Sequence, residues 1–369
     1  MENIEEQALE ILARLGSQPA VSFHEAGVAQ MVKAVLWDLG VAFRTDDFGN
    51  ILARVPGQRP DAVPLALVAH LDHPGFEAVA HQGDRLVAQA LGGVPAASFS
   101  TGVPLRVLLP GGERLPAATA GQHGAEADRQ VLVRLDAPQP VPLPCPVVFD
   151  LVDFQVHEEF IRMRALDDLA GCGSILMALA IFARERPPGD VYGIFTRAEE
   201  VGLLGARLLA EAGTLPPETL VVSLESSRTL PGAEIGGGPV IRVGDAATTF
   251  SADAEAALLR ARETLQAQRP GFKVQRQLMS GGTCEASAFA LYGYHCTGIA
   301  YPLGNYHNAG TEGRIEAEFI HRQDFLGGIE LMVAAAHSVP ERESLNVRRR
   351  LRQMPEEYRQ RLRDTAGAV

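Results

Sequence analysis

The chain has 369 residues, of which 46% are hydrophobic and 21% charged, a composition typical of a globular protein rather than a disordered one. This length exceeds what one hydrophobic core usually supports, so we expect two domains, or one domain with a large insertion. The 45 acidic and 33 basic side chains give a formal net charge of -12. Such a charge argues against a nucleic-acid backbone or an anionic membrane surface as the main partner.

The cysteines and the amino-terminal residues indicate the cellular compartment. The four cysteines stand far apart in the sequence and form no CxxC pair, so we expect reduced thiols. The first six residues carry acids where a signal peptide carries basic residues. No apolar run reaches the roughly 20 residues that a membrane-spanning helix needs. We therefore predict a cytoplasmic protein that has no membrane partner.

The first predicted elements are helical. Apolar residues recur at about the 3.6-residue period between residues 5 and 40, which predicts an outer helix layer. The run from Leu65 to His70 is apolar up to its last residue and predicts a strand covered on both faces of a parallel sheet. Between about 75 and 160, short apolar runs alternate with Gly, Pro and polar turns, which predicts a small all-β module.

Helices and strands alternate again after this module. Asp167 and Asp168 open a long apolar segment that we expect to be a helix, because acids favour a helix amino terminus. The further predicted strands are Val191–Thr196, Thr219–Leu224 and His295–Ala300. The tail from about 341 to 369 is rich in Arg and Glu. Its basic run, Arg348 to Arg350, is interleaved with acids nearby, which favours a solvent-exposed helix over a nucleic-acid patch.

This order predicts an α/β fold with a β module inserted between the first parallel strand and the helix at residue 167. We assign residues 1–73 and 161–369 to a discontinuous main domain and residues 74–160 to the insert. An insert that branches from the first strand would expose surface that a second copy could bury. We therefore expect a homo-oligomer, either a dimer or a larger shell.

Histidines and carboxylates follow the ends of the predicted strands. They are His70, Glu199, Glu200, Glu225 and His307. Ligands of an open parallel sheet bind beyond the carboxyl ends of its strands, so these side chains should converge with the aspartates that open the helix at 167. Imidazole and carboxylate groups without a thiolate are ligands for divalent zinc, cobalt or manganese. The sequence therefore predicts a metal site at this edge.

Charge balance indicates two metal ions rather than one. The acids of the set are Asp167, Glu199, Glu200 and Glu225. Their negative charges balance two divalent cations, whereas a single ion would leave the site strongly anionic. We expect His70 with one carboxylate at the first ion, His307 with another at the second, and one Asp that bridges the two.

The adjacent acids Glu199 and Glu200 are expected to differ in function. Consecutive side chains of an extended segment point to opposite sides. One acid can therefore bind metal while its neighbour takes a proton from metal-activated water. Asp72, two residues beyond His70, is placed to hold that imidazole through its other ring nitrogen.

Each of these features can also be purely structural. A pair of glutamates is usually a solvated face, a lone histidine is usually a satisfied polar group, and paired aspartates can complement a helix dipole. Five separate strand or helix ends carry the residue types that one binuclear site needs, however. That coincidence favours the metal site.

Five short segments stand in an order that carries a family resemblance. They are Val-Ala-His-Leu-Asp at 68–72, Ala-Leu-Asp-Asp at 165–168, Glu-Glu-Val-Gly-Leu at 199–203, Gly-Gly-Thr at 281–283 and Tyr-His at 306–307. In this order they resemble the glutamyl-aminopeptidase and tetrahedral-aminopeptidase family of co-catalytic metallopeptidases. The resemblance covers most of the chain. It implies a phosphorylase/hydrolase-like α/β catalytic domain, a β-barrel-like dimerisation insert and a pair of zinc or cobalt ions.

The resemblance also implies a function for each matching residue. The implied ligands are His70, Asp167 as the bridging group, Glu200, Glu225 and His307. Glu199 matches the general base. The sequence thus predicts a binuclear metal-dependent hydrolase that cleaves peptide bonds, namely an aminopeptidase acting on short peptides.

Departures from the family pattern leave other functions open. His73, Leu169, Ala198 and Cys284 stand where an acid, Arg, Gln and Asp are common. Glu225 stands where that family generally has Asp, and related carboxypeptidases and N-deacylases resemble this sequence in using Glu. An N-acyl-amino-acid deacylase or a carboxypeptidase is therefore the first alternative. A catalytically impaired assembly or binding protein is the second.

Overall fold

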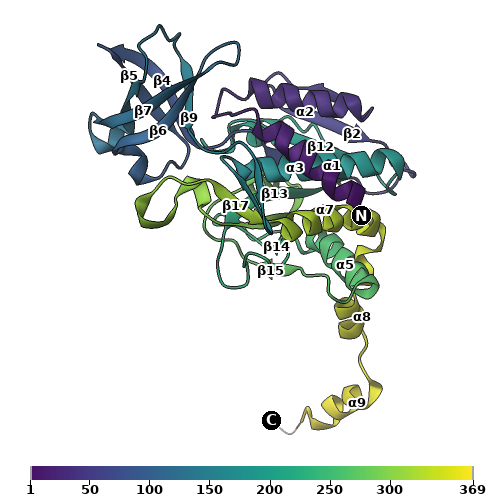
Figure 1. Cartoon of the computed structure of the whole chain (residues 1–369). Coiled ribbons are helices and arrows are strands. Elements are labelled where there is room, and N and C mark those ends of the chain that lie inside the picture. Colours follow the sequence, from purple (N-terminus) through teal and green to yellow (C-terminus); the bar gives the residue numbers. More distant parts are fainter. Residues whose placement is uncertain (1, 368–369) are drawn as a thin grey trace.

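The computed structural model describes residues 2–367, with side chains described from residue 4 onward. It contains an α/β domain and a small β-barrel that stands to one side of it (Figure 1). The α/β fold class with an inserted barrel-like module, predicted from the sequence, is confirmed.

An eight-stranded sheet forms the centre of the α/β domain, in the order β1-β2-β12-β3-β13-β16-β14-β15. The strands are β1 (Ala42–Thr45), β2 (Ile51–Val55), β3 (Leu65–His70), β12 (Val191–Thr196), β13 (Leu220–Arg228), β14 (Val240–Arg242), β15 (Gln275–Gln277) and β16 (His295–Leu303). The neighbours β12, β3, β13 and β16 are parallel, and antiparallel strands flank them on both sides. The carboxyl ends of these four strands therefore lie at one edge of the sheet.

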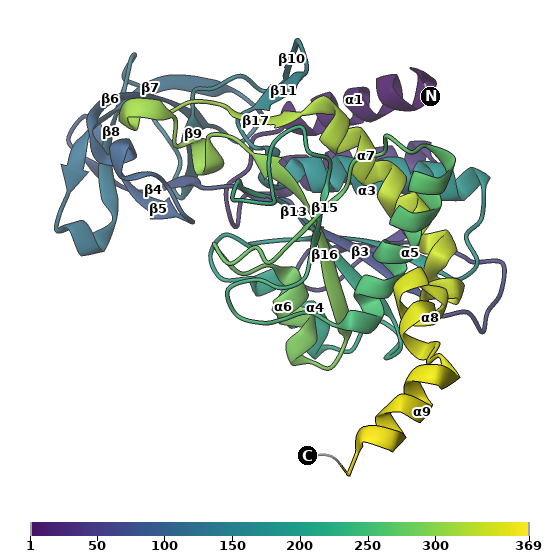
Figure 2. The same cartoon turned by 90° about the horizontal axis from the view of Figure 1, so that it is seen from below.

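Helices cover both faces of the sheet (Figures 1 and 2). The helices are α1 (Glu2–Gly16), α2 (Ala26–Asp38), α3 (Leu166–Arg184), α4 (Leu204–Glu211), α5 (Ala252–Gln268), α6 (Glu285–Leu291), α7 (Arg322–Ser338), α8 (Asn346–Arg352) and α9 (Glu356–Thr365). Leu65 and Leu67 of β3 pack with α1, α3 and α7, whereas Ala66 and Val68 pack with α4 and α6. Alternate side chains of a strand point to opposite faces, so a strand covered on both faces is continuously apolar.

The predicted helical region at 5–40 is two helices rather than one. The chain leaves α1 at Gly16, and α2 begins only at Ala26. Pro19 lies in the break, and a proline disfavours helical backbone at the residue before it. The intervening loop carries Ser22 and Glu25, both buried, toward the edge of the sheet.

Helix α3 is the most deeply buried helix of the central layer. Among the described residues it is the one helix that is long and apolar enough to cross a membrane by length and composition, yet 89% of that stretch is buried inside the fold. It packs against β3 and β13 and against α1 and α7. Its apolar character is therefore explained by its central position.

The insert forms a closed barrel with the order β4-β5-β8-β7-β6-β9. Its strands are β4 (Gly75–Gln82), β5 (Arg85–Leu91), β6 (Thr101–Leu108), β7 (Arg114–His123), β8 (Gln130–Leu135) and β9 (Cys145–Phe149). The barrel has an apolar core of its own, in which the rings of Phe76 and Phe149 meet edge to face at 5.9 Å. It can therefore hold its shape without help from the larger sheet.

A third, smaller sheet joins the end of the insert to the main domain. It contains β10 (Gln155–His157), β11 (Phe160–Met163) and β17 (Glu318–His321), in that order. Strand β11 thus pairs with β17, which lies far along the chain from the insert, and β10 pairs with β11. The domain division at residues 74 and 160 stays a prediction.

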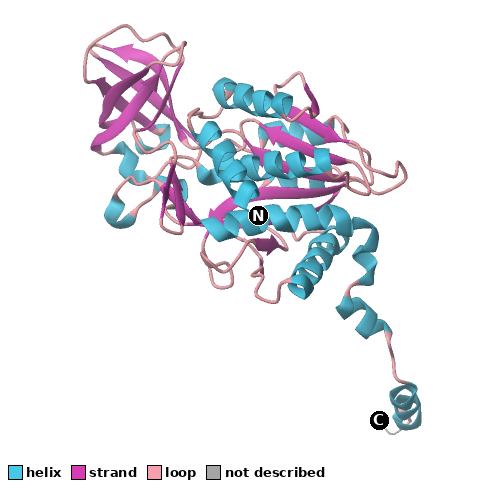
Figure 3. Ribbon diagram, turned by 45° about the vertical axis from the view of Figure 1, so that its right-hand side comes forward, coloured by secondary structure: helices cyan, strands magenta, loops and turns pink. Residues whose placement is uncertain are grey.

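The predicted solvent-exposed helix of the tail is two short helices, α8 and α9, and neither contains a buried residue. They follow α7 and a 3-10 segment, Val339–Ser344, and extend away from the α/β domain (Figures 1 and 3).

Replacing Phe149 by alanine is expected to lower the free energy of unfolding by about 3–5 kcal/mol, because the change leaves a cavity in the barrel core. Phe48→Ala serves as the matched control, since Phe48 is 51% exposed and should change stability by less than about 0.5 kcal/mol. Urea unfolding followed by circular dichroism measures both. Equal losses for the two variants would contradict the independent barrel core.

Candidate metal centre

The structure brings the sequence-predicted residues together at the carboxyl edge of the parallel strands. His70 is the last residue of β3, Glu225 lies in β13 and Asp167 lies at the start of α3. His307 lies in a 3-10 turn after β16. One oxygen of Asp167 is 3.5 Å from Nε2 of His70, and the other is 3.6 Å from Nε2 of His307. Asp167 therefore stands between the two imidazoles.

The donor atoms form overlapping sets whose members all lie within 4.8 Å of one another. The sets are His70 with Asp167 and Glu225, Asp167 with Glu200 and His307, and His70 with Glu199 and Glu200. The first two sets share Asp167 and no other residue. Two adjacent sets that share one carboxylate match the arrangement expected for two cations and a bridging aspartate.

The buried oxygens of this cluster fit divalent cations. Oδ1 of Asp167 and Oε1 of Glu225 are buried and have no hydrogen-bond partner. A buried acceptor without a partner costs about 1–3 kcal/mol, so such atoms are rare unless an ion or water satisfies them. Imidazole nitrogens and carboxylate oxygens are donors that zinc, cobalt and manganese accept. The residues present therefore suit metal binding.

Protonation compensates part of the buried charge in the metal-free protein. Burial raises the pKa of Glu200 to about 7 and that of Glu225 well above its usual value. Burial opposes protonation of His307, but the charge of Glu200 and the contact with Asp167 outweigh it and raise the pKa of His307 to about 9. For Asp167, burial is outweighed by its contacts with both imidazoles, and its pKa falls to about 2. Protons on the imidazoles thus occupy the position that cations would take.

Glu199 and Glu200 lie in a turn after β12, not in the extended segment that was expected. The turn begins at Ala198, whose φ of 53° is in the left-handed region. The two side chains still contact different imidazoles, because Glu199 lies 3.8 Å from His70 and Glu200 lies 3.5 Å from His307, although one donor set joins both acids to His70. The geometry therefore allows different functions for the two acids. A backbone turn, and not the expected extended segment, separates their positions.

Asp72 holds this turn and also lies beside the imidazole of His70. Its carboxylate accepts hydrogen bonds from the backbone N–H groups of Glu199 and Glu200, at 3.0 and 3.2 Å, and from the hydroxyl of Ser22 at 2.6 Å. Nδ1 of His70 lies 2.9 Å from the backbone carbonyl of Asp72 but 3.7 Å from its carboxylate. Asp72 therefore holds the ring nitrogen mainly through its main chain, while its carboxylate pairs with the ring at the longer distance.

Glu25 and Gly205 hold the same turn from its other side. The buried carboxylate of Glu25 accepts from the guanidinium of Arg197, at 2.7 and 2.8 Å, and from the N–H of Ala198 at 3.0 Å. A Cβ atom at Gly205 would lie 2.5 Å from the carbonyl oxygen of Arg197, so no side chain fits there. The position of the Glu199–Glu200 turn is therefore defined by packing and by buried hydrogen bonds.

Glu318 is a site residue that the sequence analysis missed. It lies in β17 and is buried. Its carboxylate accepts from the N–H groups of Leu166 at 2.7 Å, Asp167 at 3.1 Å and His307 at 2.9 Å. One side chain thus fixes the backbone of two candidate ligands. No sequence pattern marks Glu318, because its position depends on how β17 packs beside two distant segments.

Two more buried acids surround the cluster. Glu285, the first residue of α6, accepts from Thr196 at 3.1 Å and from Ser223 at 2.9 Å, and its charge adds to burial in raising the pKa of Glu225. Asp168 follows Asp167 through a cis peptide bond, and burial raises its pKa well above the usual value. The site therefore holds more carboxylates than the predicted ligand set contains.

The barrel contributes backbone to the site. Nδ1 of His307 donates to the carbonyl of Gly93, at 3.0 Å, in the loop after β5. A Cβ atom at Gly93 would lie 2.5 Å from this ring nitrogen, and one at Gly92 would lie 2.9 Å from Cβ of Glu200. Glycines are therefore required where the insert meets the cluster. The contact leaves Nε2 of His307 facing Asp167.

The four departures from the family pattern occupy structural positions. His73 is buried, and burial lowers its pKa to about 3, so the ring is neutral and bonds to the backbone of Ala20 and Pro74. Leu169 and Cys284 belong to the apolar cores on the two faces of the sheet. None of the four departures displaces a member of the His70–Asp167–His307 cluster.

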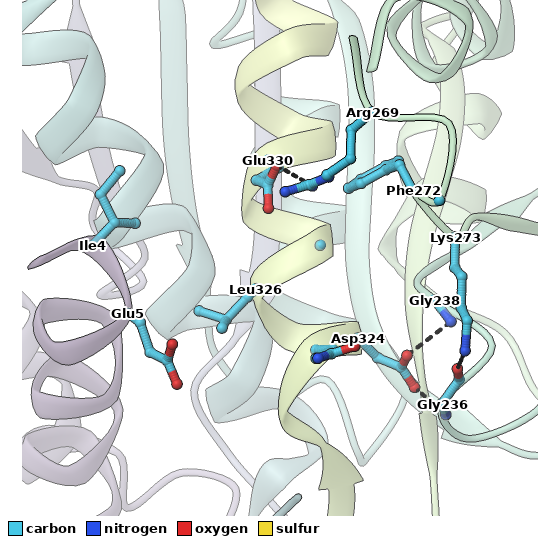
Figure 4. Close-up of a pocket in the computed structure, with 13 residues that line it drawn as sticks. Ile4, Glu5, Gly236, Gly238, Arg269, Phe272, Lys273, Asp324, Leu326 and Glu330 are labelled. Carbon is cyan, nitrogen blue, oxygen red and sulfur yellow. Dashed lines mark hydrogen bonds and ion pairs between the residues drawn. The ribbon is translucent and has the colours of Figure 1, made fainter. Parts of the chain in front are cut away.

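A cavity of about 560 Å³ lies elsewhere, between α1, α7 and the segment at 269–273 (Figure 4). In it, Arg269 pairs with Glu330, and the carboxylate of Asp324 accepts from the N–H groups of Gly236 and Gly238 at 2.7 and 2.8 Å. Its lining includes none of the candidate ligands. The chemistry of the cluster therefore does not depend on this cavity.

Comparison with known families gives one match. The sequence profile of the M42 glutamyl aminopeptidase family matches residues 141–325, half of the chain. The matched range includes Asp167, Glu199, Glu200, Glu225 and His307. No curated protein sequence matches significantly.

Solved structures share the fold. An aminopeptidase from Desulfurococcus kamchatkensis superposes with a TM-score of 0.76 at 20% identity, covering 93% of this chain and 98% of its own. A TET aminopeptidase from a marine-sediment Thaumarchaeota archaeon gives 0.76 at 19%, covering 91% and 99%. The TET1 peptidase of Pyrococcus horikoshii, which can assemble into a tetrahedron or a large octahedral shell, gives 0.71 at 22%, covering 89% and 99%.

Zinc binding near neutral pH is expected to release about one to two protons per chain, because Glu200 and His307, with pKa values of about 7 and 9, hold protons that a cation displaces. Both values lie above the ordinary values of 4.5 and 6.5, so the folded metal-free protein binds more protons than the unfolded chain. These two groups therefore stabilise the metal-free fold at low pH, and that contribution is lost as pH rises toward 7 and 9.

Calorimetric titration with Zn²⁺ at pH 7, in two buffers of different ionisation enthalpy, measures the released protons. Identical heats in the two buffers would contradict the expected proton release. Titrations at pH 6 and pH 8 should show tighter binding at the higher pH.

Proposed function

The chain belongs to the M42 glutamyl aminopeptidase family and is a metal-dependent aminopeptidase, and we propose that it cleaves short peptides at the cluster around Asp167. The observation that carries the proposal is the position of Asp167, which directs one oxygen toward His70 and the other toward His307. Such a carboxylate can join two cations at one reaction centre.

The donor sets suggest a ligand assignment. We assign His70, Asp167 and Glu225 to one ion, and Asp167, Glu200 and His307 to the other. Zinc is the first choice, with cobalt or manganese as alternatives, because the donors are imidazoles and carboxylates with no thiolate among them. When bound, such ions polarise the scissile carbonyl and make water a nucleophile at neutral pH.

Glu199 is the residue that we assign to proton transfer. Its carboxylate lies 3.8 Å from Nε2 of His70, and burial raises its pKa well above the usual value, which favours a carboxylate that binds and releases a proton. It takes the proton of the attacking water and returns it to the leaving amine. Asp72 supports this function by holding the backbone N–H of Glu199.

Replacing the two adjacent glutamates separately should divide proton transfer from metal binding. Glu199→Ala is expected to keep the metal content and to lower kcat by about 10²–10⁴-fold. Glu200→Ala is the matched comparison, and it is expected to lose bound metal, as is His70→Ala. Metal analysis by plasma mass spectrometry and peptide hydrolysis assays measure the two effects. Near-full activity of Glu199→Ala would remove the assignment.

The charge of the site favours the amino end of the substrate. The negative charges of Glu199 and Glu285 add to burial in raising the pKa of Glu225, and the charge of Glu285 does the same for the pKa of Glu199. The whole chain carries a net charge of -12. A cationic ammonium group suits this surrounding better than a free carboxylate does. Glu225 in place of Asp remains the feature that the deacylase and carboxypeptidase alternatives share.

Free-amine and blocked substrates test this choice. A leucyl or glutamyl peptide with a free amino terminus is expected to be cleaved at least about tenfold faster than its N-acetylated form, because a neutral amide loses the attraction of the acidic site. The assay measures kcat/KM for each pair on the zinc-loaded protein. Faster cleavage of the acetylated form would favour the deacylase, whereas fewer than one bound ion per chain after reconstitution would favour the impaired protein.

We further propose that the protein is a cytoplasmic homo-oligomer. All four cysteines are buried and unpaired, which suits a reducing compartment. The barrel stands clear of the α/β domain and offers a face for a second copy (Figure 1). The shells that the Pyrococcus horikoshii relative forms make a larger assembly the hypothesis to test first.

A further inference from the structure

The carboxyl-terminal segment, residues 346–365, is the part of the molecule that the peptidase function leaves unexplained. We call it the C-terminal arm; it contains α8 and α9. It projects from the α/β domain and its end lies far from the body of the molecule in both views (Figures 1 and 2). The family match ends at residue 325. The solved relatives are covered almost completely, at 98–99%, while 7–11% of this chain stays unmatched.

The arm carries exposed apolar side chains at helical spacing. Val347 and Leu351 stand four residues apart in α8, and Tyr358 and Leu362 stand four residues apart in α9. Residues four apart share one face of a helix. Leu351 is 73% exposed and Leu362 is 66% exposed. Each short helix therefore presents an apolar face to solvent, and Met354 between them is exposed as well.

The arm has little to stabilise it within its own chain. Helix α9 has ten residues, none of them buried, and the side-chain hydrogen bonds and ion pairs given for its described residues all join residues of α9. Helix α8 contacts the body through the N–H of Asn346, which donates to Glu263, and through Arg348, which donates to the carbonyl of Ala252. Arg348 and Arg352 also pair with Glu343 of the preceding 3-10 segment. These contacts hold α8, whereas the described residues of α9 make none to the body. Isolated helices of this length are marginal in water. A helical arm with an open apolar face is stable when a partner covers it.

Charge identifies the class of partner. The arm has seven arginines and three acids, a net charge of +4. The rest of the chain then has 26 basic and 42 acidic side chains and carries -16. Ten of these acids and two of these arginines are buried, which still leaves an excess of acids outside the core. The body of a second copy of this chain is therefore opposite in charge to the arm. A nucleic-acid partner is disfavoured, because that same body would repel a phosphate backbone and because acids interrupt the basic face of α9.

We propose that the C-terminal arm docks, through Leu351, Met354, Tyr358 and Leu362, onto the acidic body of a second copy of this chain. Exchange of arms between two copies would bury both apolar faces and pair both basic arms with acidic surface. Within one chain the arm lies away from both the barrel and the metal centre (Figures 1 and 2). It does not require peptidase activity.

Variants of the arm test the proposal in the full-length protein. The double variant Leu351→Asp/Leu362→Asp and a chain that ends at Leu345 are expected to weaken self-association at least tenfold. Gln353→Asp/Gln360→Asp is the matched control, because it adds the same two charges two residues away from each leucine. Gln360 lies on the opposite side of α9 from Leu362, and Gln353 is the residue that follows the last turn of α8. Its association should match that of the unaltered chain. Sedimentation velocity over a range of concentrations measures each.

Isotope-mixed cross-linking identifies the partner. Equal amounts of unlabelled and ¹⁵N-labelled protein are mixed, cross-linked and digested, and cross-links between arm and body are expected between labelled and unlabelled chains. The seven arginines of the arm also make trypsin a probe, and its cleavage should slow as the protein concentration rises. Association that is unchanged in the leucine variant would overturn the proposal. So would arm-to-body cross-links confined to single chains, or an arm that is bound only when a DNA duplex is added.

Discussion

Asp167 directs its two buried oxygens at two imidazoles, and the need to compensate the negative charge around it governs the rest of the site. Seven further acids lie close to it in the cluster or directly behind it: Asp72, Asp168, Glu199, Glu200, Glu225, Glu285 and Glu318. Burial alone would drive such groups to the neutral form. In the metal-free protein the imidazoles hold protons in compensation, and two cations would replace them. A cluster of so many buried carboxylates is therefore suited to binding metal cations.

Buried hydrogen bonds hold the backbone of the site in position. Asp72 holds the N–H groups of the Glu199–Glu200 turn, and Glu318 holds those of Asp167 and His307. These hydrogen bonds fix the main chain. The candidate ligands therefore keep their positions while some of their carboxylate oxygens make no hydrogen bond. The orphaned oxygens of Asp167 and Glu225 are the result. The carboxylates that hold the backbone, those of Asp72 and Glu318, are thus not the carboxylates that we assign to metal binding.

The parallel sheet, the barrel and the C-terminal arm contribute differently to the molecule. The parallel sheet carries the candidate ligands at the ends of its strands, and the barrel reaches the same edge through Gly93, which contacts His307. The arm at the carboxyl terminus lies away from both and differs from the body in charge. The profile match includes Asp167, Glu200, Glu225 and His307 but ends at residue 325, before the arm.

The sequence by itself determined the continuously apolar strand at Leu65–His70, the inserted β module and the members of the candidate cluster, because these depend on local patterns and on which residues end each strand. Only the folded structure shows that Asp72 also holds the Glu199–Glu200 turn, that Glu318 anchors two ligand segments, and that Gly93 of the barrel contacts His307. The structure also shows that the helical region predicted at residues 5–40 is interrupted around Pro19. Those contacts join segments that are far apart in sequence, and no local pattern encodes which buried acid meets which backbone N–H group.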